Sequence, residues 1–385
     1  MVQLLPLSWV EIVLALYWSL SVGYLLLFAA FAYFWFGTKE KIGVPKVLPG
    51  VSLVIAIRNE QANLAALFAQ LNQLNYPQLE VLLVDDQSED GSVALLQQAA
   101  EQAQAAGRHW QVLQSTGSGK KAAISTALAV ARGELIVTTD ADCGFSPDWI
   151  SGLIAPFYDQ NIQLVAGPVM TTPHPHYYFS AFQQVEWSSI LLVTHMSFRT
   201  GVPFMCSAAN MAYRKAAFEA VNGYTGNGQY LSGDDEFLLK KITKKYGKTA
   251  FRYLNSQKLL VRTMPQPHWK AYLTQRARWA SKWRLHNLGH ILLALVPFAL
   301  QLSFLASPFL LWLGTAGALT FLLLWACKWV AEYLVVRPIL RSFGYGLTLS
   351  GSLFTCVIHP IYAMATAIWT LSGRWEWKGR KQTTQ

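Results

Sequence analysis

Hydrophobic positions along the chain form two blocks of long apolar runs around a central stretch of shorter ones. The first block, residues 9–36 (WVEIVLALYWSLSVGYLLLFAAFAYFWF), exceeds the roughly 20 apolar residues that span a bilayer. Neither a basic region nor a small-residue cleavage site accompanies it, so we expect a retained anchor rather than a removed signal. The second block covers 288–372 and divides into predicted spans at 289–312, 316–336 and 347–371.

The central stretch alternates short strand-like runs with helix-like segments. The predicted strands are 51–57, 81–86, 111–114 and 134–140, and the predicted helices are 62–74, 92–106 and 120–131. This alternation indicates a parallel sheet with right-handed crossovers. The strand runs are apolar almost throughout, as expected when helices cover both faces of the sheet. We therefore predict an α/β domain inserted between N-terminal and C-terminal transmembrane helices.

Five segments follow from this pattern. They are an N-terminal anchor with a basic linker (1–46), the α/β domain (47–267), an amphipathic interfacial helix (268–287), C-terminal transmembrane helices (288–372) and a basic tail (373–385). Within the middle C-terminal span, Lys328 and Glu332 are four residues apart, so we expect them to pair on one helix face.

Composition supports a membrane protein. Hydrophobic residues make up 53% of the chain and charged residues only 14%, below the roughly 25% usual in soluble domains. The net charge of +10 suits nucleic acid, anionic lipid or phosphorylated substrates. Basic residues gather beside the apolar segments, which favours the membrane over nucleic acid as the partner. The four cysteines form no CxxC pair, which argues against a disulfide framework or a zinc site.

Basic residues also predict the orientation. Lys39, Lys41 and Lys46 follow the first apolar block and no basic residue precedes it, which predicts that the α/β domain lies in the cytosol. We expect the membrane to be the plasma membrane. Three later spans would leave the basic residues of 374–381 outside. Either the last apolar segment is re-entrant or interfacial, or the tail departs from the rule.

Acidic residues end three of the predicted strands. Glu60 follows the first strand, Asp85 and Asp86 the second, and Asp140 and Asp142 the fourth. A single acid after a strand often caps the next helix. Three acidic strand ends instead favour one ligand site, because open α/β sheets bind ligands at the carboxyl ends of their strands. No GxGxxG follows the first strand, which disfavours a dinucleotide-binding dehydrogenase.

The spacing Asp140-x-Asp142 suits a divalent metal. Alternate residues of an extended segment face the same way, so both carboxylates can approach one ion. Mg²⁺ commonly takes one or two carboxylates together with substrate phosphates.

Several motifs in order resemble family-2 glycosyltransferases of the GT-A fold. They are VSLVIAIRNE (51–60), VLLVDDQSEDGS (81–92), GKKAAISTAL (119–128), TTDADCGFSPDWI (138–150), NMAYRKAAFEAVNGY (210–224), SGDDEFLLKK (232–241) and QRARW (275–279). The likeness covers about residues 48–285. It implies an enzyme, a glycosyltransferase, with a Rossmann-like nucleotide-sugar-binding domain that uses Mg²⁺ or Mn²⁺.

The resemblance also implies roles for individual residues. Asp86, with Asp85 as a less certain neighbour, corresponds to the acid that binds the nucleoside. Lys120 or Lys121 corresponds to a lysine near the nucleotide. Asp140 and Asp142 correspond to the carboxylates that hold the metal and the diphosphate, with Asp142 as the direct ligand, and Glu60 joins them as a substrate-binding candidate.

The later acidic motif of the family usually reads Glu-Asp, with the aspartate as general base. Here Asp235 corresponds to the base and Asp234 replaces the glutamate. An inverting displacement needs a carboxylate that accepts the proton of the acceptor hydroxyl. The alternative is that these acids only begin a helix, where the helix dipole favours negative charge.

The QRARW segment matches the (Q/R)xxRW pattern of the membrane-bound branch of the family. Gln275, Arg278 and Trp279 fall on one helix face, and Trp283 continues the stripe. An arginine there can bind diphosphate oxygens, and an indole can form a wall at the acceptor. The segment also has the character of an interfacial amphipathic helix, and both descriptions can hold together.

These observations predict inverting transfer from a nucleotide diphosphate sugar to a lipid or a growing glycan. The donor is expected to be a UDP-sugar from the family resemblance alone. No residue by itself identifies the base of the nucleotide. One alternative is a processive polysaccharide synthase of the β-linked N-acetylglucosamine type, although the few spans argue against a complete polymer channel. Another is a non-catalytic nucleotide-sugar-binding scaffold, but Asp86, Asp142 and Asp235 are all present. A transporter is disfavoured because polar residues concentrate in the central domain.

Overall fold

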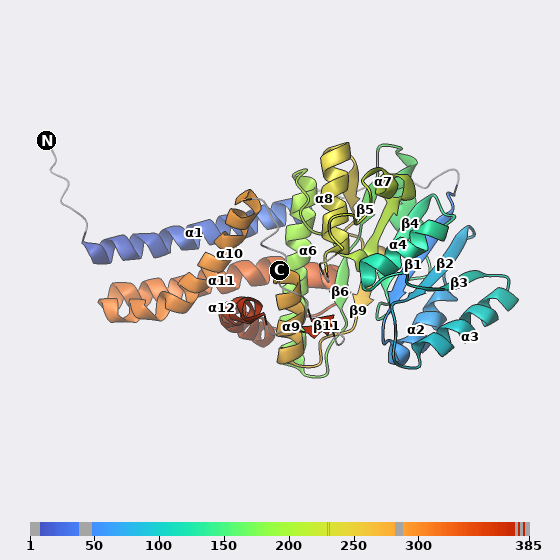
Figure 1. Cartoon of the computed structure of the whole chain (residues 1–385). Helices are drawn as coiled ribbons and strands as arrows, with labels where there is room; N and C mark the ends of the chain where they lie inside the picture. Colours follow the sequence, from blue (N-terminus) through green and yellow to red (C-terminus); the bar gives the residue numbers. More distant parts are fainter. Residues whose placement is uncertain are drawn as a thin grey trace. The chain divides into compact units, whose positions relative to one another are not determined.

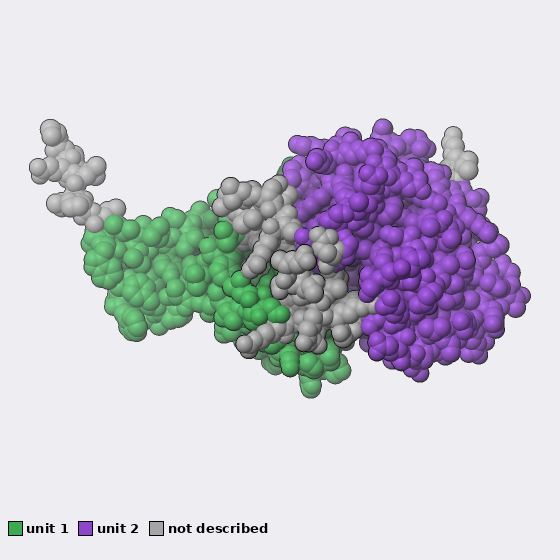
Figure 2. All heavy atoms as spheres, viewed as in Figure 1, with its two compact units in different colours: residues 1–37, 173–189, 266–375 green, residues 38–172, 190–265, 376–385 purple. Residues whose placement is uncertain are grey.

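The computed structural model divides into two compact units (Figure 2). It describes residues 8–37, 48–228, 230, 232–281, 288–373, 376–377 and 380–381. The unit that we call the helical unit comprises residues 1–37, 173–189 and 266–375, and the sheet unit comprises residues 38–172, 190–265 and 376–385. Residues 173–189, which the sequence pattern assigns to the α/β domain, thus group with the helices.

The sheet unit contains a seven-stranded sheet of order β3-β2-β1-β4-β7-β5-β8 (Figure 1). Its strands are β1 (Val51–Ile57), β2 (Leu79–Asp85), β3 (His109–Gln114), β4 (Leu135–Asp140), β5 (Leu164–Ala166), β7 (Met211–Arg214) and β8 (Phe251–Tyr253). The first four strands pair in parallel, as predicted. In contrast, β7 runs antiparallel to β4 and β5. A separate parallel pair joins β6 (Val169–Thr171) and β9 (Val261–Thr263), and β10 (Glu376–Trp377) pairs with β11 (Arg380–Lys381).

Helices connect these strands close to the predicted positions. They are α2 (Gln61–Leu71), α3 (Ser92–Ala105), α4 (Lys120–Val130), α5 (Trp149–Ile154), α7 (Lys215–Ala220) and α8 (Asp234–Tyr246), with 3₁₀ turns η1 (Ala155–Tyr158), η2 (Ala208–Asn210) and η3 (Gln257–Leu259). The first three confirm the helices predicted between the parallel strands. Helix α6 (Tyr177–Arg199) contributes its first part to the helical unit.

The centre of the sheet explains the position of the polar strand ends. Leu53, Ile55 and Ile57 of β1 are fully buried, because neighbouring elements cover both faces of a parallel sheet. The chain order reverses at β1, which has β2 on one side and β4 on the other. Such a reversal leaves a crevice at the carboxyl ends of the strands. Asp140 ends β4 at this edge, and Asp86 follows β2 there.

The helical unit consists of long apolar helices. They are α1 (Trp9–Phe36), α10 (Leu288–Ala306), η5 (Ser307–Leu313), α11 (Gly314–Ser342) and α12 (Leu349–Ser372), together with the shorter α9 (Trp269–Ala280). Three described segments are long and apolar enough to cross a membrane, namely Trp9–Phe36, Leu295–Ser342 and Leu349–Ser372. The second of these combines the predicted spans 289–312 and 316–336, and α11 begins at Gly314, where φ is +69°.

Polar contacts inside this unit join helices distant in the sequence. The predicted pair of Lys328 and Glu332 is confirmed, with Lys328 fully buried. The Tyr24 hydroxyl of α1 donates to Glu332 of α11 at 2.5 Å. Such pairing offsets the large penalty for placing a charge in an apolar environment.

Candidate active site

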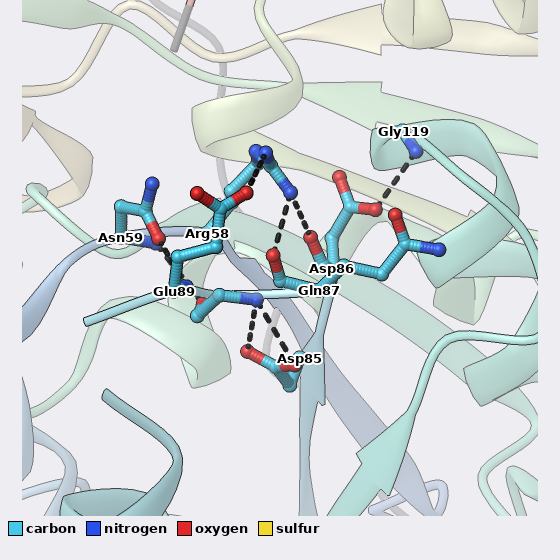
Figure 3. Close-up of polar contacts among 8 residues, drawn as sticks. Arg58, Asn59, Asp85, Asp86, Gln87, Glu89 and Gly119 are labelled. Carbon is cyan, nitrogen blue, oxygen red and sulfur yellow. Dashed lines mark hydrogen bonds and ion pairs between the residues drawn. The ribbon is translucent and has the colours of Figure 1, made fainter. Parts of the chain in front are cut away.

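The loop that follows β2 is held by side chains from its own ends (Figure 3). The Asp85 carboxylate accepts hydrogen bonds from the backbone N–H of Ser88 at 3.2 Å and from Nε2 of Gln114 at 3.0 Å. Asp86 accepts from the backbone N–H of Gly119 at 2.8 Å. Gly119 precedes α4 with φ +94°, a conformation that favours glycine. Asp86 thus links the end of β2 to the start of α4, while Asp85 shapes the loop.

The end of β1 supports the same loop. Nη1 of Arg58 donates to the carbonyl oxygens of Asp86 at 2.9 Å and Gln87 at 2.6 Å, and Nη2 pairs with Glu89 at 3.2 Å. The side-chain oxygen of Asn59 accepts from the Glu89 N–H at 2.8 Å (Figure 3). The sequence marks Arg58 and Asn59 as polar residues at a strand end, but it does not show that they order the neighbouring loop.

The two aspartates after β4 come together as predicted. Ligating atoms of Asp140, Asp142 and Cys143 all lie within 4.8 Å of one another. The Thr263 hydroxyl, from β9, donates to Asp142 at 2.9 Å and orients its carboxylate. Burial, and then the charge of Asp140, raise the pKa of Asp142. No sequence pattern identifies Thr263, because the pairing of distant strands brings it here.

The ligating atoms of Asp140, Asp142 and Cys143 indicate which metals could bind here. Burial and the charges of Asp142 and Asp140 raise the pKa of the Cys143 thiol, so sulfur is a poor ligand here. Carboxylate and hydroxyl oxygens remain, which are the ligands that Mg²⁺ and Mn²⁺ prefer. The residues present therefore fit a hard divalent cation.

Lys120, the first of the two candidate lysines, forms ion pairs with two carboxylates. Nζ of Lys120 lies 2.5 Å from Asp140 and 3.1 Å from Asp234. Burial opposes its charge, but the charges of Asp140 and Asp234 raise the Lys120 pKa and keep it protonated. Nζ of Lys121 instead donates to the carbonyl oxygens of Tyr230 at 2.6 Å and Ser232 at 2.8 Å. Lys121 therefore fixes the segment that leads into α8.

The start of α8 supplies two further acids. Gly233 has φ +89°, and Asp234 and Asp235 occupy the first turn of the helix. Asp234 is buried, and although burial opposes ionisation, Lys120 lowers its pKa. Asp235 is half-buried, and its carboxylate accepts from the backbone N–H of Glu236 at 2.7 Å and of Ala208 at 3.2 Å. These bonds orient the Asp235 carboxylate.

We define the acidic cluster as Asp140, Asp142, Asp234 and Asp235 with Lys120. Glu60 lies at its margin, where its carboxylate accepts from Asn63 at 2.7 Å and its charge contributes to the raised pKa of Asp142. The cluster as defined contains four carboxylates and one lysine. Such an excess of negative charge suits a divalent cation and a proton-accepting carboxylate.

The QRARW residues lie on α9 in the helical unit. Gln275, Arg278 and Trp279 are half-buried, whereas Tyr272 and Arg276 are buried. Nη2 of Arg276 donates to the Tyr272 hydroxyl at 2.7 Å. Sequence reasoning missed Arg276, whose partners become visible only after folding. The predicted continuation of the stripe to Trp283, and with it 282–287, lies outside the described residues.

A family model described as Glycosyl transferase family 2 matches residues 52–221. Residues 52–221 are thus similar to family-2 glycosyltransferases. The matched region includes the Asp85–Asp86 loop, Lys120 and the two aspartates after β4, but not α8 or the QRARW helix.

Proteins similar to part of this chain include enzymes named for lipid acceptors. An undecaprenyl-phosphate 4-deoxy-4-formamido-L-arabinose transferase from Aeromonas hydrophila is 40% identical over 111 residues, or 27% of this chain and 32% of that protein. A beta-monoglucosyldiacylglycerol synthase from Trichormus variabilis is 32% identical over 120 residues, or 31% of this chain and 25% of that protein. The match thus spans about a third or less of these relatives.

A solved structure resembles more of the chain. A mannosyltransferase from Pyrobaculum calidifontis, solved in complex with GDP-Man and Mn²⁺, is 19% identical, covers 95% of this chain and 99% of its own, and gives a TM-score of 0.62. This likeness shows the fold, which is the GT-A fold expected from the sequence.

Proposed function

We propose that this protein is a membrane-bound inverting glycosyltransferase that transfers a sugar from a nucleotide diphosphate sugar, a UDP-sugar by family resemblance, to a lipid or a growing glycan. The acidic cluster at the carboxyl ends of the parallel strands carries the proposal, because it combines a pair of carboxylates that could hold a metal ion with a separate acid on α8. The family-2 domain and the GT-A fold support the reaction class.

The donor side of the reaction falls to the strand ends. Asp86 binds the nucleoside, with Asp85 shaping the loop beside it, and Glu60 borders the same site. Lys120 contributes positive charge beside the diphosphate. A Mg²⁺ or Mn²⁺ ion held by Asp142 and Asp140 would offset the charge that develops on the departing nucleoside diphosphate.

The acceptor side falls to Asp235. Its carboxylate takes the proton of the acceptor hydroxyl while the hydroxyl oxygen bonds to the anomeric carbon and the bond to the diphosphate breaks, which inverts the configuration. Asp234 supports this acid through Lys120. By family resemblance, the diphosphate and the acceptor are also contacted by Gln275, Arg278 and Trp279.

A lipid acceptor is favoured by two observations. Within the described residues, three segments are long and apolar enough to cross a membrane, and the named relatives are a transferase to undecaprenyl phosphate and a synthase of a glucosyldiacylglycerol. We propose that the glycosyltransferase domain lies in the cytosol, on the basis of the lysines that follow the first apolar block, and that the membrane is the plasma membrane. A growing glycan, made by a processive synthase, is the second candidate.

The test uses the full-length protein purified in detergent. It is incubated with Mn²⁺, a panel of UDP- and GDP-sugars, and either undecaprenyl phosphate or diacylglycerol in micelles. Acceptor-dependent release of nucleoside diphosphate, with one sugar added per lipid, supports the proposal. Release that yields long polymers supports the processive synthase. Binding of nucleotide sugar with no release under any combination supports the non-catalytic scaffold and contradicts the proposal.

A further inference from the structure

The helical unit contains a buried charged group that the proposed mechanism does not use. Oε2 of Glu186, on α6, lies 3.6 Å from Nε of Arg276, on α9. The other carboxylate oxygen lies 2.8 Å from Nε2 of His359, and the Tyr362 hydroxyl donates to Oε2 at 3.2 Å. Burial opposes ionisation of Glu186, but His359 and the charge of Arg276 lower its pKa. The carboxylate thus ties α6 to both α9 and α12.

Arg276 in turn lies among aromatic rings. Its guanidinium carbon is 4.4 Å from the ring centre of Trp279, 4.7 Å from that of Tyr272 and 5.3 Å from that of Trp187. The rings of Trp187 and Trp279 meet edge to face, with centroids 5.6 Å apart and planes at 79°. A planar guanidinium stacks on ring faces in a way that an ammonium group does not. Arg276 and Trp187 therefore fix the orientation of the Trp279 indole.

A fixed indole matters because Trp279 is half-buried and belongs to the QRARW segment. A side chain that forms a wall of a binding site contributes affinity when its orientation is set before the ligand arrives, since no rotamer freedom is then lost on binding. Arg276 is 5% exposed, which leaves it little surface for a ligand of its own. The ion pair is thus placed to act through its neighbour.

We propose that Glu186 and Arg276 are positioning residues for Trp279 and thereby set the affinity for the acceptor. Glu186 fixes the guanidinium of Arg276, and the guanidinium fixes the indole. The link to the acceptor rests on the proposed function, whereas the effect on the orientation of Trp279 does not.

The first test reads the indole without turnover. The full-length protein is labelled with 5-fluorotryptophan, and the ¹⁹F resonance of Trp279 is identified by its loss in Trp279→Phe. Arg276→Lys keeps the charge beside Glu186 but removes the planar stack, so the Trp279 resonance should shift and broaden. Glu186→Gln should move the same resonance, because the guanidinium loses its anchor. An unchanged Trp279 resonance in both variants overturns the proposal, whether or not the protein transfers sugar.

Arg214→Met provides a matched control. Arg214 is also buried, pairs with Glu134 at 2.5 Å and lies over the Phe157 ring at 5.4 Å, but it belongs to the sheet unit and pairs at the start of β4, opposite the strand ends of the site. This variant should lower stability and leave the Trp279 resonance in place.

The second test separates positioning from general damage. With the lipid that the wild-type enzyme glycosylates, undecaprenyl phosphate or diacylglycerol, Arg276→Lys should raise the acceptor KM by about 3- to 30-fold with little change in kcat. Because Arg276 acts through Trp279, the double variant with Trp279→Phe should be no worse than Trp279→Phe alone. Additive increases in the acceptor KM overturn the proposal. If the wild type transfers sugar to neither lipid, the proposed function is contradicted instead. The ¹⁹F resonance of Trp279 then decides whether Glu186 and Arg276 position the indole.

Discussion

The acidic cluster of the sheet unit and the Glu186 group of the helical unit differ in how well the charge of their carboxylates is balanced. In the cluster, Lys120 lies near three acids, and Asp142 has a raised pKa because it is partly buried and lies beside Asp140. In the helical unit, Glu186 has cationic and hydroxyl partners on two helices, and its pKa is lowered despite burial. A surplus of carboxylates suits the binding of a cation, whereas a carboxylate matched by cationic and hydroxyl partners suits the internal organisation of the helices.

Burial therefore has different consequences in the two units. A partly buried charge beside a like charge opposes folding, and sites of this kind persist where a ligand or a reaction uses them. A buried charge with good partners holds helices in one arrangement, and removal of one partner leaves the other uncompensated. The comparison predicts that substitutions in the two groups differ in the sign of their effect on stability as well as in their effect on activity.

Asp235→Asn should give the largest loss. The amide keeps the shape of the side chain but cannot accept the acceptor proton, so transfer should fall by roughly 10²- to 10⁴-fold. Donor binding should change little, because this acid faces the acceptor in the proposed reaction. Asp234→Asn is the neighbouring control and should reduce transfer less. Near-normal transfer by Asp235→Asn, or a larger loss from Asp234→Asn, would show that Asp235 is not the general base.

Glu186→Gln should destabilise the helical unit. Loss of one member of a buried ion pair typically costs about 3–5 kcal/mol, because the remaining charge is uncompensated. Thermal unfolding of the detergent-solubilised protein, followed by scanning fluorimetry, should show a clear fall in Tm relative to wild type. A Tm equal to that of wild type would mean that Glu186 is not matched in the folded protein.

Lys120→Met should tighten metal binding in the absence of nucleotide. The ammonium group lies 2.5 Å from Asp140 and competes with a cation for that carboxylate, so its removal should strengthen Mn²⁺ binding by roughly tenfold. Donor binding should weaken, since positive charge beside the diphosphate is lost. Isothermal titration with Mn²⁺ alone and then with UDP separates the two effects. Weaker binding of Mn²⁺ alone would contradict this role for the lysine.

Asp142→Asn should give the smallest effect on stability, and with the opposite sign to Glu186→Gln. Folding raises the pKa of Asp142, so its ionisation opposes folding as the pH rises through that pKa. In chelator at neutral pH, the uncharged amide should therefore raise Tm slightly, and the gain should shrink in acid, where the carboxyl is protonated. A fall in Tm as large as that of Glu186→Gln would remove the distinction between the two groups.

The sequence predicts the acidic cluster better than it predicts the Glu186 group. The parallel strands follow from apolar runs such as Val51–Ile57, and the spacing of Asp140 and Asp142 is a local pattern on an extended segment. These features depend on neighbours in the chain. The antiparallel strand β7 was not predicted, because Met211–Arg214 is too short to carry a clear pattern.

Contacts between distant segments account for the rest. Thr263 reaches Asp142 because β9 pairs with β6, and Glu186 reaches Arg276 because α6 and α9 pack in one unit. Within QRARW the helical periodicity predicts that Gln275, Arg278 and Trp279 share a face, but it gives no partner for Arg276. A pattern along one helix cannot name the residue that a second helix supplies.

Direct measurement of Mn²⁺ binding tests the contrast between the two groups. Metal-free wild-type protein, Asp142→Ala and Glu186→Gln are titrated with Mn²⁺, and free Mn²⁺ is counted by electron paramagnetic resonance. We expect one Mn²⁺ per chain in the wild type and in folded Glu186→Gln, and loss of that ion in Asp142→Ala. Equal Mn²⁺ binding by wild type and Asp142→Ala would contradict the assignment of the acidic cluster as the metal site.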